Sequence, residues 1–582
     1  MIWHMTSHAS TAALRAARDH LVAVRSDHEA AAREFRWPDV GTSFNWATDW
    51  FDVIADGNDK VALWIVEEDG REEQVTFADM AARSDRVASR LADVGVSHGD
   101  HVLLMLGNQV ELWESMLAVM KLGAVILPTS TMLEGHDLQD RIDRGDVRHV
   151  VTNVGETDKF ADVTGSFTRV SVGGTAAGWT DYPDSRTGPT DRPDVETAAD
   201  DPCLVYFTSG TTSKPKMVVH TQVSYPVGHL TTMYWLGLRA DDVHLAISSP
   251  GWGKHAWSCF FAPWIAEATV FVHNYSRFDA RALRHQLDRA AVTSFCAPPT
   301  VWRLLIQADL GTRPAHLQEI VSAGEPLNPE VIAQVQRAWG LTIRDGYGQT
   351  ETTAAIGNPP GAAVRPGSMG VPLPGVTVTL LDPVTGEPAV EGEVCLDLDA
   401  VPVNLMAGYF RDPERTADAI RDGRFHTGDV AVRDDDGFLT FIGRTDDVFK
   451  SSDYKISPFE VESALLEHPA VAESAVVPAP DAVKLNVVKA YVTLAAGWEP
   501  TEETARAVLA HARTALPAYE RVRRVEFGSL PKTISGKIRR VELRDREAQA
   551  ALDSDEQLPG EWRDSQFPEL ARSRARSERP PR

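Results

Sequence analysis

Apolar residues recur at helical and strand-like spacings through the first third of the chain. Residues 75–96 place apolar side chains three and four positions apart, which predicts a helix. Residues 100–108 are a short apolar run of the kind that forms a buried strand. The same alternation continues with a helix at 109–123 and strands at 124–130, 148–153 and 167–172. Strands that alternate with helices predict a parallel or mixed sheet covered by helices.

The pattern changes near residue 370. Short strands separated by turn residues in 375–398 predict a small β-rich subdomain, and 424–444 predicts a hairpin around an Asp-Asp-Gly turn. A helix followed by a strand in 458–477, a strand at 488–494 and a helix at 503–516 predict a small α+β domain. The predicted fold class is therefore α/β, with a large N-terminal domain of mixed sheets and helices, a β-rich subdomain and a small α+β C-terminal domain.

Four segments follow from these patterns. An alanine-rich helix from about Ser10 to Phe35 gives an N-terminal helical extension, 1–37. The large domain spans 38–445 and the small domain 446–550. The arginine-rich end, 551–582, is predicted to be a disordered basic tail.

Composition narrows the class of protein. The 582 residues carry a formal charge of −25, which disfavours a general nucleic-acid binder. The four cysteines lie far apart, with no CxxC pair, so we expect no zinc site or disulfide framework but a reducing, cytoplasmic location. No apolar run approaches the roughly 20 residues of a membrane helix, and no membrane partner is expected.

The loop "FTSGTTSKPK" (207–216) concentrates hydroxyls and two lysines between two apolar segments. Backbone N–H groups and hydroxyls can surround phosphate oxygens, and lysine adds a point charge. The spacing is not that of a Walker A loop, because no Gly-Lys-Ser/Thr follows and no helix is signalled behind it. The loop predicts a phosphate site of another class; a solvated Ser/Thr hairpin is the alternative.

Five more stretches occur in order along the chain: "GWGKHAWSCFFAPW", "SAGEPL", "DGYGQTETT", "FHTGDVAVRDDDGFLTFIGRTDDVFKSSDYKISPFEVE" and "LPKTISGKIRR". Together with the loop, they make residues 40–545 resemble the superfamily of adenylate-forming enzymes, which comprises acyl- and aryl-CoA synthetases, adenylation domains and luciferases. The similarity is closest to medium-chain-type acyl-CoA synthetases. The joint occurrence of these motifs is far more specific than any one of them.

The resemblance implies an ATP-dependent acid-thiol ligase that first forms acyl-AMP and then acyl-CoA, with ATP/AMP, Mg²⁺ and coenzyme A as its nucleotides, metal and thiol. Tyr347 would stack on adenine, Thr350 would contact the α-phosphate and Glu351 would hold Mg²⁺. The other implied nucleotide-binding residues are Thr208, Ser209, Gly210, Thr211, Thr212, Ser213, Lys216, Gly324, Glu325, Pro326, Asp345, Gly346, Gly348 and Gln349.

The C-terminal motifs supply the remaining implied roles. Asp429 would accept both ribose hydroxyls, backed by Arg444, and an ion pair that closes the hairpin is a compatible reading. Lys537 would stabilise the charge shared by the carboxylate and the α-phosphate. Asp446 matches the hinge about which a mobile small domain would turn between half-reactions, and Lys455 would face coenzyme A. Lys532 is a weaker catalytic candidate than Lys537.

The acyl pocket should be apolar with few polar guides. The resemblance places the acid beside the motif that begins at Gly251, and core packing is the alternative role for these aromatic side chains. The sequence does not choose among medium-chain fatty, aryl and polycyclic acids as substrates. A homodimer is also an open expectation. The candidates for the pocket wall are Trp252, His255, Trp257, Phe260 and Ala297, with Phe295 and Trp302 as further candidates.

Two residues depart from the family pattern. Ser213 replaces the usual glycine of the phosphate loop, and Asp453 replaces the glycine that borders the pantetheine channel. The first departure bears on adenylation and the second on thioester formation, so an enzyme specialised for one half-reaction is an alternative. A non-catalytic nucleotide- or acyl-binding protein is a second alternative, although Lys537 and Glu351 are not needed for binding alone. The complete two-step ligase remains the leading hypothesis.

Overall fold

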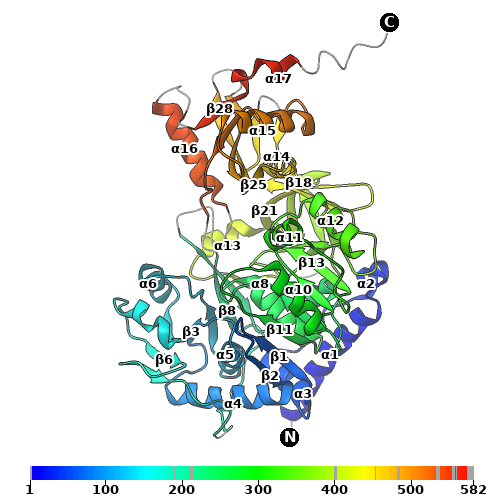
Figure 1. The fold of residues 1–582 in the computed structure, drawn as a ribbon. Coiled ribbons are helices and arrows are strands. Elements are labelled where there is room, and N and C mark those ends of the chain that lie inside the picture. Colours follow the sequence, from blue (N-terminus) through cyan, green and yellow to red (C-terminus); the bar gives the residue numbers. More distant parts are fainter. Residues whose placement is uncertain are drawn as a thin grey trace. The chain divides into compact units, whose positions relative to one another are not determined.

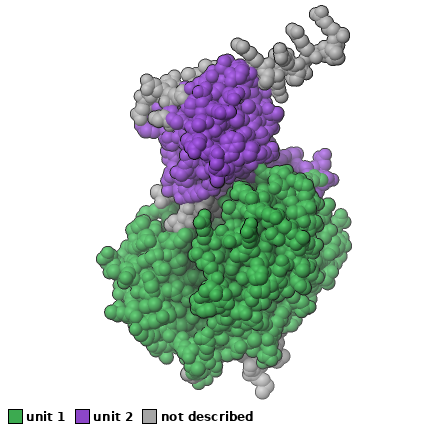
Figure 2. Space-filling view, in the orientation of Figure 1, with its two compact units in different colours: residues 1–378, 396–426 green, residues 379–395, 427–582 purple. Residues whose placement is uncertain are grey.

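The computed structural model divides the chain into two compact units. The large unit comprises residues 1–378 and 396–426, and the small unit comprises 379–395 and 427–582 (Figure 2). This division places the hairpin at 424–444 largely in the small unit, whereas the sequence predicted a boundary at 445. The residues described here are 3–188, 190–208, 214–398, 403–451, 454–481, 485–532, 538–553, 558 and 560–572.

The large unit contains a nine-stranded sheet in the order β16-β15-β14-β13-β12-β10-β11-β1-β2. Figure 1 labels β13, β11, β1 and β2 of this sheet. Its central pairs, from β14 to β1, are parallel, and its outer pairs are antiparallel. The strands are β1 (Val61–Val66), β2 (Glu72–Thr76), β10 (Val243–Ala246), β11 (Thr269–His273), β12 (Ser294–Cys296), β13 (Glu319–Ala323), β14 (Arg344–Tyr347), β15 (Ile356–Gly357) and β16 (Val371–Pro372).

A second sheet of the large unit has eight strands in the order β19-β9-β8-β4-β3-β5-β6-β7. Strands β8 and β9 are antiparallel neighbours, while β4, β3, β5 and β6 run parallel, as the alternation of strands and helices predicted. The strands are β3 (His101–Met105), β4 (Val125–Pro128), β5 (Val147–Asn153), β6 (Thr168–Val172), β7 (Thr180–Asp181), β8 (Pro202–Thr208), β9 (Lys216–Thr221) and β19 (Gly408–Tyr409).

Helices cover these sheets because their apolar stripes face inward. In α4, for example, Thr76 caps the first turn by accepting from Asp79 N–H, and Met80, Val87 and Leu91 are buried on one face. The helices of the large unit are α1 (Trp3–Ala23), α2 (His28–Glu34), η1 (Trp46–Phe51), α3 (Asp52–Ala55), α4 (Phe77–Asp93), α5 (Val110–Lys121), α6 (Gly135–Arg144), η2 (Val154–Phe160), α7 (Leu230–Leu236), α8 (Gly253–Ala256), η3 (Trp257–Phe261), α9 (Ala262–Ile265), α10 (Ala280–Arg289), α11 (Pro299–Gln307), α12 (Pro329–Trp339) and α13 (Pro413–Ala419).

The N-terminal extension differs from the single helix expected between Ser10 and Phe35. Two helices, α1 and α2, are separated at residues 24–27. The Asp27 carboxylate accepts a hydrogen bond from Ala30 N–H and starts the second helix. A capping residue inside an alanine-rich run therefore divides it, because it satisfies the N–H groups at a new helix start.

A five-stranded sheet corresponds to the predicted β-rich subdomain. It has the order β17-β18-β21-β20, with β22 also paired to β21. Gly437 N–H donates to Asp434 O at the predicted Asp-Asp-Gly turn between β21 and β22. The strands are β17 (Val378–Leu381), β18 (Glu391–Asp397), β20 (Ile420–Arg421), β21 (Arg424–Arg433) and β22 (Leu439–Arg444), followed by the two-stranded β23 (Phe449–Ser451) and β24 (Tyr454–Ile456).

The small unit also contains an α+β structure around the sheet β25-β26-β27-β28. Its core gathers Val461, Leu465, Val476, Val508 and Val525 from helices and strands. The α/β class, with a smaller α+β portion at the C-terminal end, is thus confirmed. The elements are α14 (Pro458–Leu466), β25 (Val471–Asp481), β26 (Leu485–Leu494), α15 (Glu502–Ala515), β27 (Arg524–Phe527), α16 (Arg540–Asp553), β28 (Glu561–Arg563), η4 (Asp564–Gln566) and α17 (Pro568–Arg572).

Part of the predicted disordered tail is folded. Strand β28 pairs antiparallel with β27, with Val525 opposite Trp562. Phe567 is buried in the core of the small unit. The sequence prediction overlooked Trp562 and Phe567, the two apolar residues that hold this segment, because the last residues are rich in charge. Among the described residues, no helix is long and apolar enough to cross a membrane.

Candidate active site

The predicted phosphate loop joins two paired strands. Thr208, at the end of β8, lies opposite Lys216, at the start of β9, in the antiparallel register. The two apolar segments that flank the loop are therefore paired strands. Ser209, Gly210, Thr211, Thr212 and Ser213 lie outside the described residues, so their phosphate contacts stay predictions.

Lys216 and Glu351 meet at one tyrosine. The Tyr409 hydroxyl donates to Glu351 Oε1 at 2.9 Å, and Lys216 Nζ donates to the same hydroxyl at 3.4 Å. The Lys216 ammonium also lies 5.1 Å from the centroid of the Tyr409 ring. Glu351 has only 9% of its surface exposed. Two motifs distant in the sequence are thus brought together in the large unit.

Thr350, the residue before Glu351, is held through its backbone. His220 Nε2 donates to Thr350 O at 2.7 Å, while His220 Nδ1 lies 3.1 Å from Ser224 Oγ. Complete burial lowers the pKa of His220 to about 4, so the ring is neutral at pH 7. The neutral imidazole serves as a fixed hydrogen-bond donor for the loop.

The glycines of the 345–351 motif are explained by close approach. A Cβ on Gly348 would lie 2.2 Å from Thr353 O and 2.5 Å from the Trp257 ring. A Cβ on Gly346 would lie 2.3 Å from the Trp235 ring. All three distances are far below van der Waals contact, so a side chain at either position would collide with an aromatic ring, and at Gly348 also with the Thr353 carbonyl.

Asp345 is buried at strand β14 rather than presented to solvent. Burial raises the pKa of its carboxyl to about 8, despite hydrogen bonds from the backbone N–H groups of Gly346 and Leu327. Tyr347 follows half-buried at the end of the same strand, and Gln349 N–H donates to Thr352 Oγ1 in the loop beyond it. Asp345 is therefore a buried acid on the strand that also carries Tyr347.

The stretch predicted to lie beside adenine follows strand β13. Gly324 has φ +105°, a backbone conformation that favours glycine, and its surface is exposed. Glu325 lies 3.9 Å from Arg303, and Pro326 is half-buried. The loop thus emerges at the carboxyl end of a parallel strand, where ligands bind in open α/β sheets.

The ribose motif lies in the small unit. Asp429 and Arg444 are opposite each other on β21 and β22, with Oδ1 and Nη1 3.3 Å apart. Asp429 is 5% exposed, and Arg444 Nε lies 3.8 Å from Asp446, the predicted hinge residue. The structure therefore contains the ion pair that closes the hairpin. The ribose and hinge roles stay predictions.

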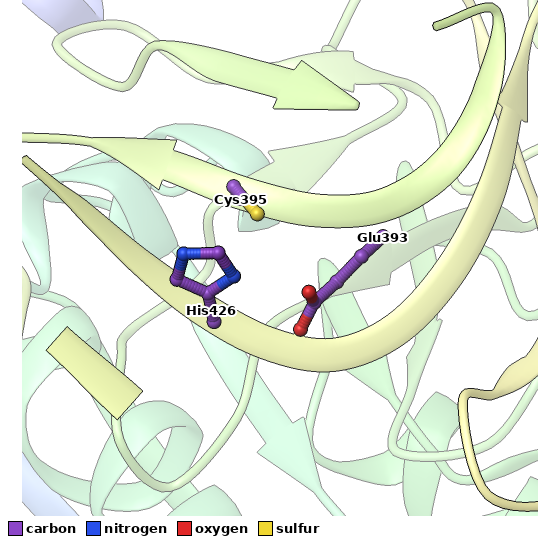
Figure 3. Close-up of side chains that lie close together, drawn as sticks. All are labelled: Glu393, Cys395 and His426. Atoms are coloured by element: carbon purple, nitrogen blue, oxygen red, sulfur yellow. The ribbon is translucent and has the colours of Figure 1, made fainter. Parts of the chain in front are cut away.

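The backbone beside Asp429 is fixed from strand β18. Glu393 Oε1 accepts from Gly428 N–H at 2.9 Å, and Thr427 Oγ1 donates to Val394 O at 2.7 Å. Figure 3 shows Glu393 with Cys395 on the same strand and His426 on β21, the side chains gathered on neighbouring strands. Their potential metal-ligating atoms lie within 4.8 Å of one another.

The loop predicted to carry the catalytic lysine is closed at its base. Lys532 and Ile538 form an antiparallel bridge, and Arg539 N–H donates to Pro531 O at 2.9 Å. Lys532 pairs with Glu473 at 2.7 Å, which gives it a structural partner. Lys537 itself lies outside the described residues.

Two anchors hold helix α16 directly after this loop. Arg540 donates to both oxygens of the buried Glu462, at 3.0 and 2.6 Å. Further along the helix, Glu547 lies 2.6 Å from the fully buried Lys489 ammonium. That ammonium also lies 2.9 Å from Glu526 and 2.7 Å from Glu561, so it fills the cluster of three carboxylates.

Of the two residues predicted to lie near coenzyme A, Lys455 is among the described residues and Asp453 is not. Lys455, on β24, lies 3.0 Å from Glu391. Asp453 lies outside the described residues. The effect of that departure on the channel stays a prediction.

Most predicted pocket residues are buried around helix α8. His255 is 3% exposed, and burial lowers its pKa to about 3, so it is neutral; its Nε2 donates to Asn108 Oδ1 at 3.1 Å. Trp257 Nε1 donates to the Tyr225 hydroxyl, and Trp252 at the helix start is half-buried. Phe260 packs on core aromatic rings, as do Phe295 and Trp302 on each other, and Ala297 is buried.

Sequence reasoning missed three residues that organise the site: Tyr409, His220 and Glu393. Tyr409 stands in an unremarkable Gly-Tyr-Phe run, and Glu393 in an acidic β-hairpin. Their partners are 58 and 35 positions away, so no local pattern announces them. His220 directly follows the apolar residues of a strand. This position was the only sign in the sequence that the histidine is buried.

Comparisons with known proteins agree with this geometry. The family model described as AMP-binding enzyme matches residues 51–410, and the model for the C-terminal domain of that family matches 460–537. The chain is 42% identical to 4-hydroxybutyrate--CoA ligase 1 of Metallosphaera sedula over 87% of this chain and 91% of that one. It is 35% identical to the mitochondrial acyl-coenzyme A synthetase ACSM3 of Mus musculus, covering 90% and 93%.

Solved structures give the same assignment. A Brucella canis acyl-CoA synthetase matches with TM-score 0.69 and 33% identity, covering 90% of this chain and 99% of that one. The anthranilate CoA ligase AuaEII, solved in complex with anthranoyl-AMP, matches with TM-score 0.79 and 28% identity, covering 88% and 99%. The chain therefore belongs to the AMP-binding enzyme family, among its AMP-forming acyl-CoA ligases.

Proposed function

We propose that the protein activates a hydrophobic carboxylic acid with ATP and transfers the acyl group to coenzyme A through the motif residues described above. The observation that carries this proposal is the meeting of Lys216 and Glu351 at Tyr409. Lys216 supplies a cation for phosphate and Glu351 a carboxylate for metal. Together they suit a nucleoside triphosphate with its divalent ion.

In the first half-reaction, a substrate carboxylate oxygen attacks the α-phosphorus while the bond to pyrophosphate breaks. Lys216 would hold the leaving phosphates, Thr350 would contact the α-phosphate, and Lys537 would stabilise the charge that develops there. Mg²⁺, when bound, would neutralise phosphate charge, and Glu351 would be its protein ligand, since carboxylate oxygens suit this ion. Asp429 would hold the ribose.

In the second half-reaction, the coenzyme A thiol releases its proton to solvent, its sulfur attacks the acyl carbon, and the acyl carbon–oxygen bond breaks so that AMP leaves with the electron pair. The hinge at Asp446 would let the small unit replace Lys537 by the segment near Lys455. The relative from Metallosphaera sedula is named for 4-hydroxybutyrate and the solved relative AuaEII for anthranilate. We therefore propose a small aliphatic or aryl acid as substrate.

The residues predicted to line the acyl pocket suit an uncharged acyl tail. His255 is neutral and hydrogen-bonded to Asn108, and the predicted pocket residues Trp257 and Ala297 are buried and apolar. The four cysteines are all free and buried, which supports a reducing compartment such as the cytoplasm. A homodimer stays a prediction.

A pair of assays with a panel of acids tests the function. Acid-dependent ATP–pyrophosphate exchange reports adenylation, and mass spectrometry of acyl-CoA reports the complete reaction. Both signals with one acid are expected. Acyl-CoA from supplied acyl-AMP without exchange would instead assign the chain to thioester formation alone, and would implicate Ser213. Exchange without acyl-CoA would implicate Asp453.

A further inference from the structure

Tyr409 lies at a junction of the large unit that no motif assigned. It belongs to the short strand β19, which pairs antiparallel with β9 so that Tyr409 faces Val218, two residues after Lys216. The residue is 7% exposed. Backbone pairing therefore fixes the start of the Tyr409 side chain beside the strand that carries Lys216.

The hydroxyl of Tyr409 has a single proton to donate. Of its contacts with Glu351 and Lys216, only Glu351 Oε1 can accept this proton, because a lysine ammonium has donors only. The hydroxyl oxygen in turn accepts from Lys216. The Tyr409 hydroxyl thus lies between the Lys216 ammonium and the Glu351 carboxylate. Lys216 donates to the hydroxyl, and the hydroxyl donates to the carboxylate.

The backbone of Glu351 is restrained as well. Met406 N–H donates to Glu351 O at 2.8 Å, and Thr353 N–H donates to Asn404 O at 3.3 Å. The segment that leads into β19 therefore holds the main chain around Glu351, and Tyr409 holds the end of its side chain. Both restraints come from one stretch of chain.

We propose that Tyr409 is a positioning residue that orients the Glu351 carboxylate toward a divalent cation and keeps Lys216 directed at phosphate. This inference rests on the proposed function, in which Glu351 is the metal ligand. By donating to one carboxylate oxygen, Tyr409 fixes the plane of the group. A fixed plane favours the geometry that Mg²⁺ demands of its ligands.

The test is Tyr409→Phe, which keeps the ring and removes only the hydroxyl. Electron paramagnetic resonance counts the Mn²⁺ that the protein binds in the presence of α,β-methylene-ATP. We expect binding to weaken ~10-fold, the range seen when a residue that orients a metal ligand is lost. Binding of AMP without metal, and acyl-CoA formation from supplied acyl-AMP, should change less than about twofold.

Tyr182 provides a matched control. Its hydroxyl also lies within hydrogen-bond distance of a glutamate, Glu114 Oε2 at 3.3 Å, but in a different part of the large unit. Tyr182→Phe should leave Mn²⁺ binding unchanged. Wild-type Mn²⁺ binding in Tyr409→Phe would overturn the inference, and so would an equal loss of AMP binding, since that would indicate general damage.

Glu351→Gln separates this inference from the proposed function. If Glu351→Gln leaves Mn²⁺ binding unchanged, the metal role of Glu351 is wrong, and the inference falls with it. If Glu351→Gln weakens Mn²⁺ binding and Tyr409→Phe does not, only the inference about Tyr409 fails. Weakening in both variants, with a smaller effect for Tyr409→Phe, is the expected result.

Discussion

Glu393 Oε1 accepts a hydrogen bond from the backbone N–H of Gly428, the residue that precedes Asp429. Hydrogen bonds to charged groups contribute about 1.5–3 kcal/mol, so this contact should fix the carboxylate that we assign to ribose. Glu393→Ala is expected to weaken ATP binding ~10-fold in isothermal titration calorimetry. Glu393→Gln keeps an acceptor oxygen and should lose less than about threefold. The exposed Glu387 on the same hairpin is the control for Ala substitution.

Lys537 should act in one half-reaction only. In Lys537→Ala, we expect acid-dependent ATP–pyrophosphate exchange to fall by ~10²-fold or more, since an electrostatic contact at the developing charge is removed. Acyl-CoA formation from supplied acyl-AMP should stay near the wild-type rate. A lysine variant that retained full exchange would show that another cation performs this step.

Arg540 and Arg539 form a matched pair beside the same loop. Arg540 is bound to both oxygens of the buried Glu462, whereas the Arg539 side chain forms a local ion pair with the exposed Glu542. Arg540→Met should lower adenylation ~10-fold through loss of the anchored loop end, because removing one partner of a buried pair leaves the other unpaired. Arg539→Met should change it less than about twofold. Equal effects in the two variants would remove the role of the Glu462 anchor.

Lys489→Met should destabilise the small unit by about 3–5 kcal/mol, because three buried carboxylates lose their shared cation. Burial works to raise the pKa of Glu561, but hydrogen bonds from Lys489 and Arg563 outweigh it and hold the pKa below its usual value. In the wild type this stability is present above pH 4.5 and is lost as the pH falls through the lowered pKa.

The variant should therefore differ most from the wild type near pH 7 and less near pH 4. Differential scanning calorimetry at both pH values measures this. Lys532→Met, which removes a partly exposed pair with Glu473, should cost at most about 1 kcal/mol. A Lys489 variant as stable as that control would mean that the carboxylates find other partners.

Asp345→Asn tests the buried acid on the strand that carries Tyr347. Its folded pKa of about 8 exceeds the ordinary value of 3.8, so between these values the folded chain holds a proton that the unfolded chain has lost. Wild-type stability should therefore decline as the pH rises toward 8, by up to about 1.4 kcal/mol per pH unit from this group. The asparagine variant lacks this decline, and urea unfolding at pH 6 and pH 8 compares the slopes. Parallel slopes would show that Asp345 ionises normally.

The sequence predicted the fold class and most motif positions because both depend on local pattern. The period of apolar residues located α4 and β3, and the loop at 207–216 announced itself through residue type. Contacts such as Tyr409 with Glu351 could not be predicted, since they depend on which strand edges meet in the folded sheet. The break after α1 was missed because a single Asp27 outweighs the helical propensity of its neighbours.

Strand β28 is the last strand of its sheet to be synthesised, so the sheet of the small unit cannot be completed until residues 561–563 have been made. Glu561 emerges from the ribosome 72 residues after Lys489, the buried ammonium that it neutralises. Until then the nascent domain holds a cation with an incomplete set of carboxylates and an unpaired edge on β27. A chain halted by a premature stop codon near residue 553 is thus expected to be recognised by chaperones and proteases, although every motif of the reaction has already been translated.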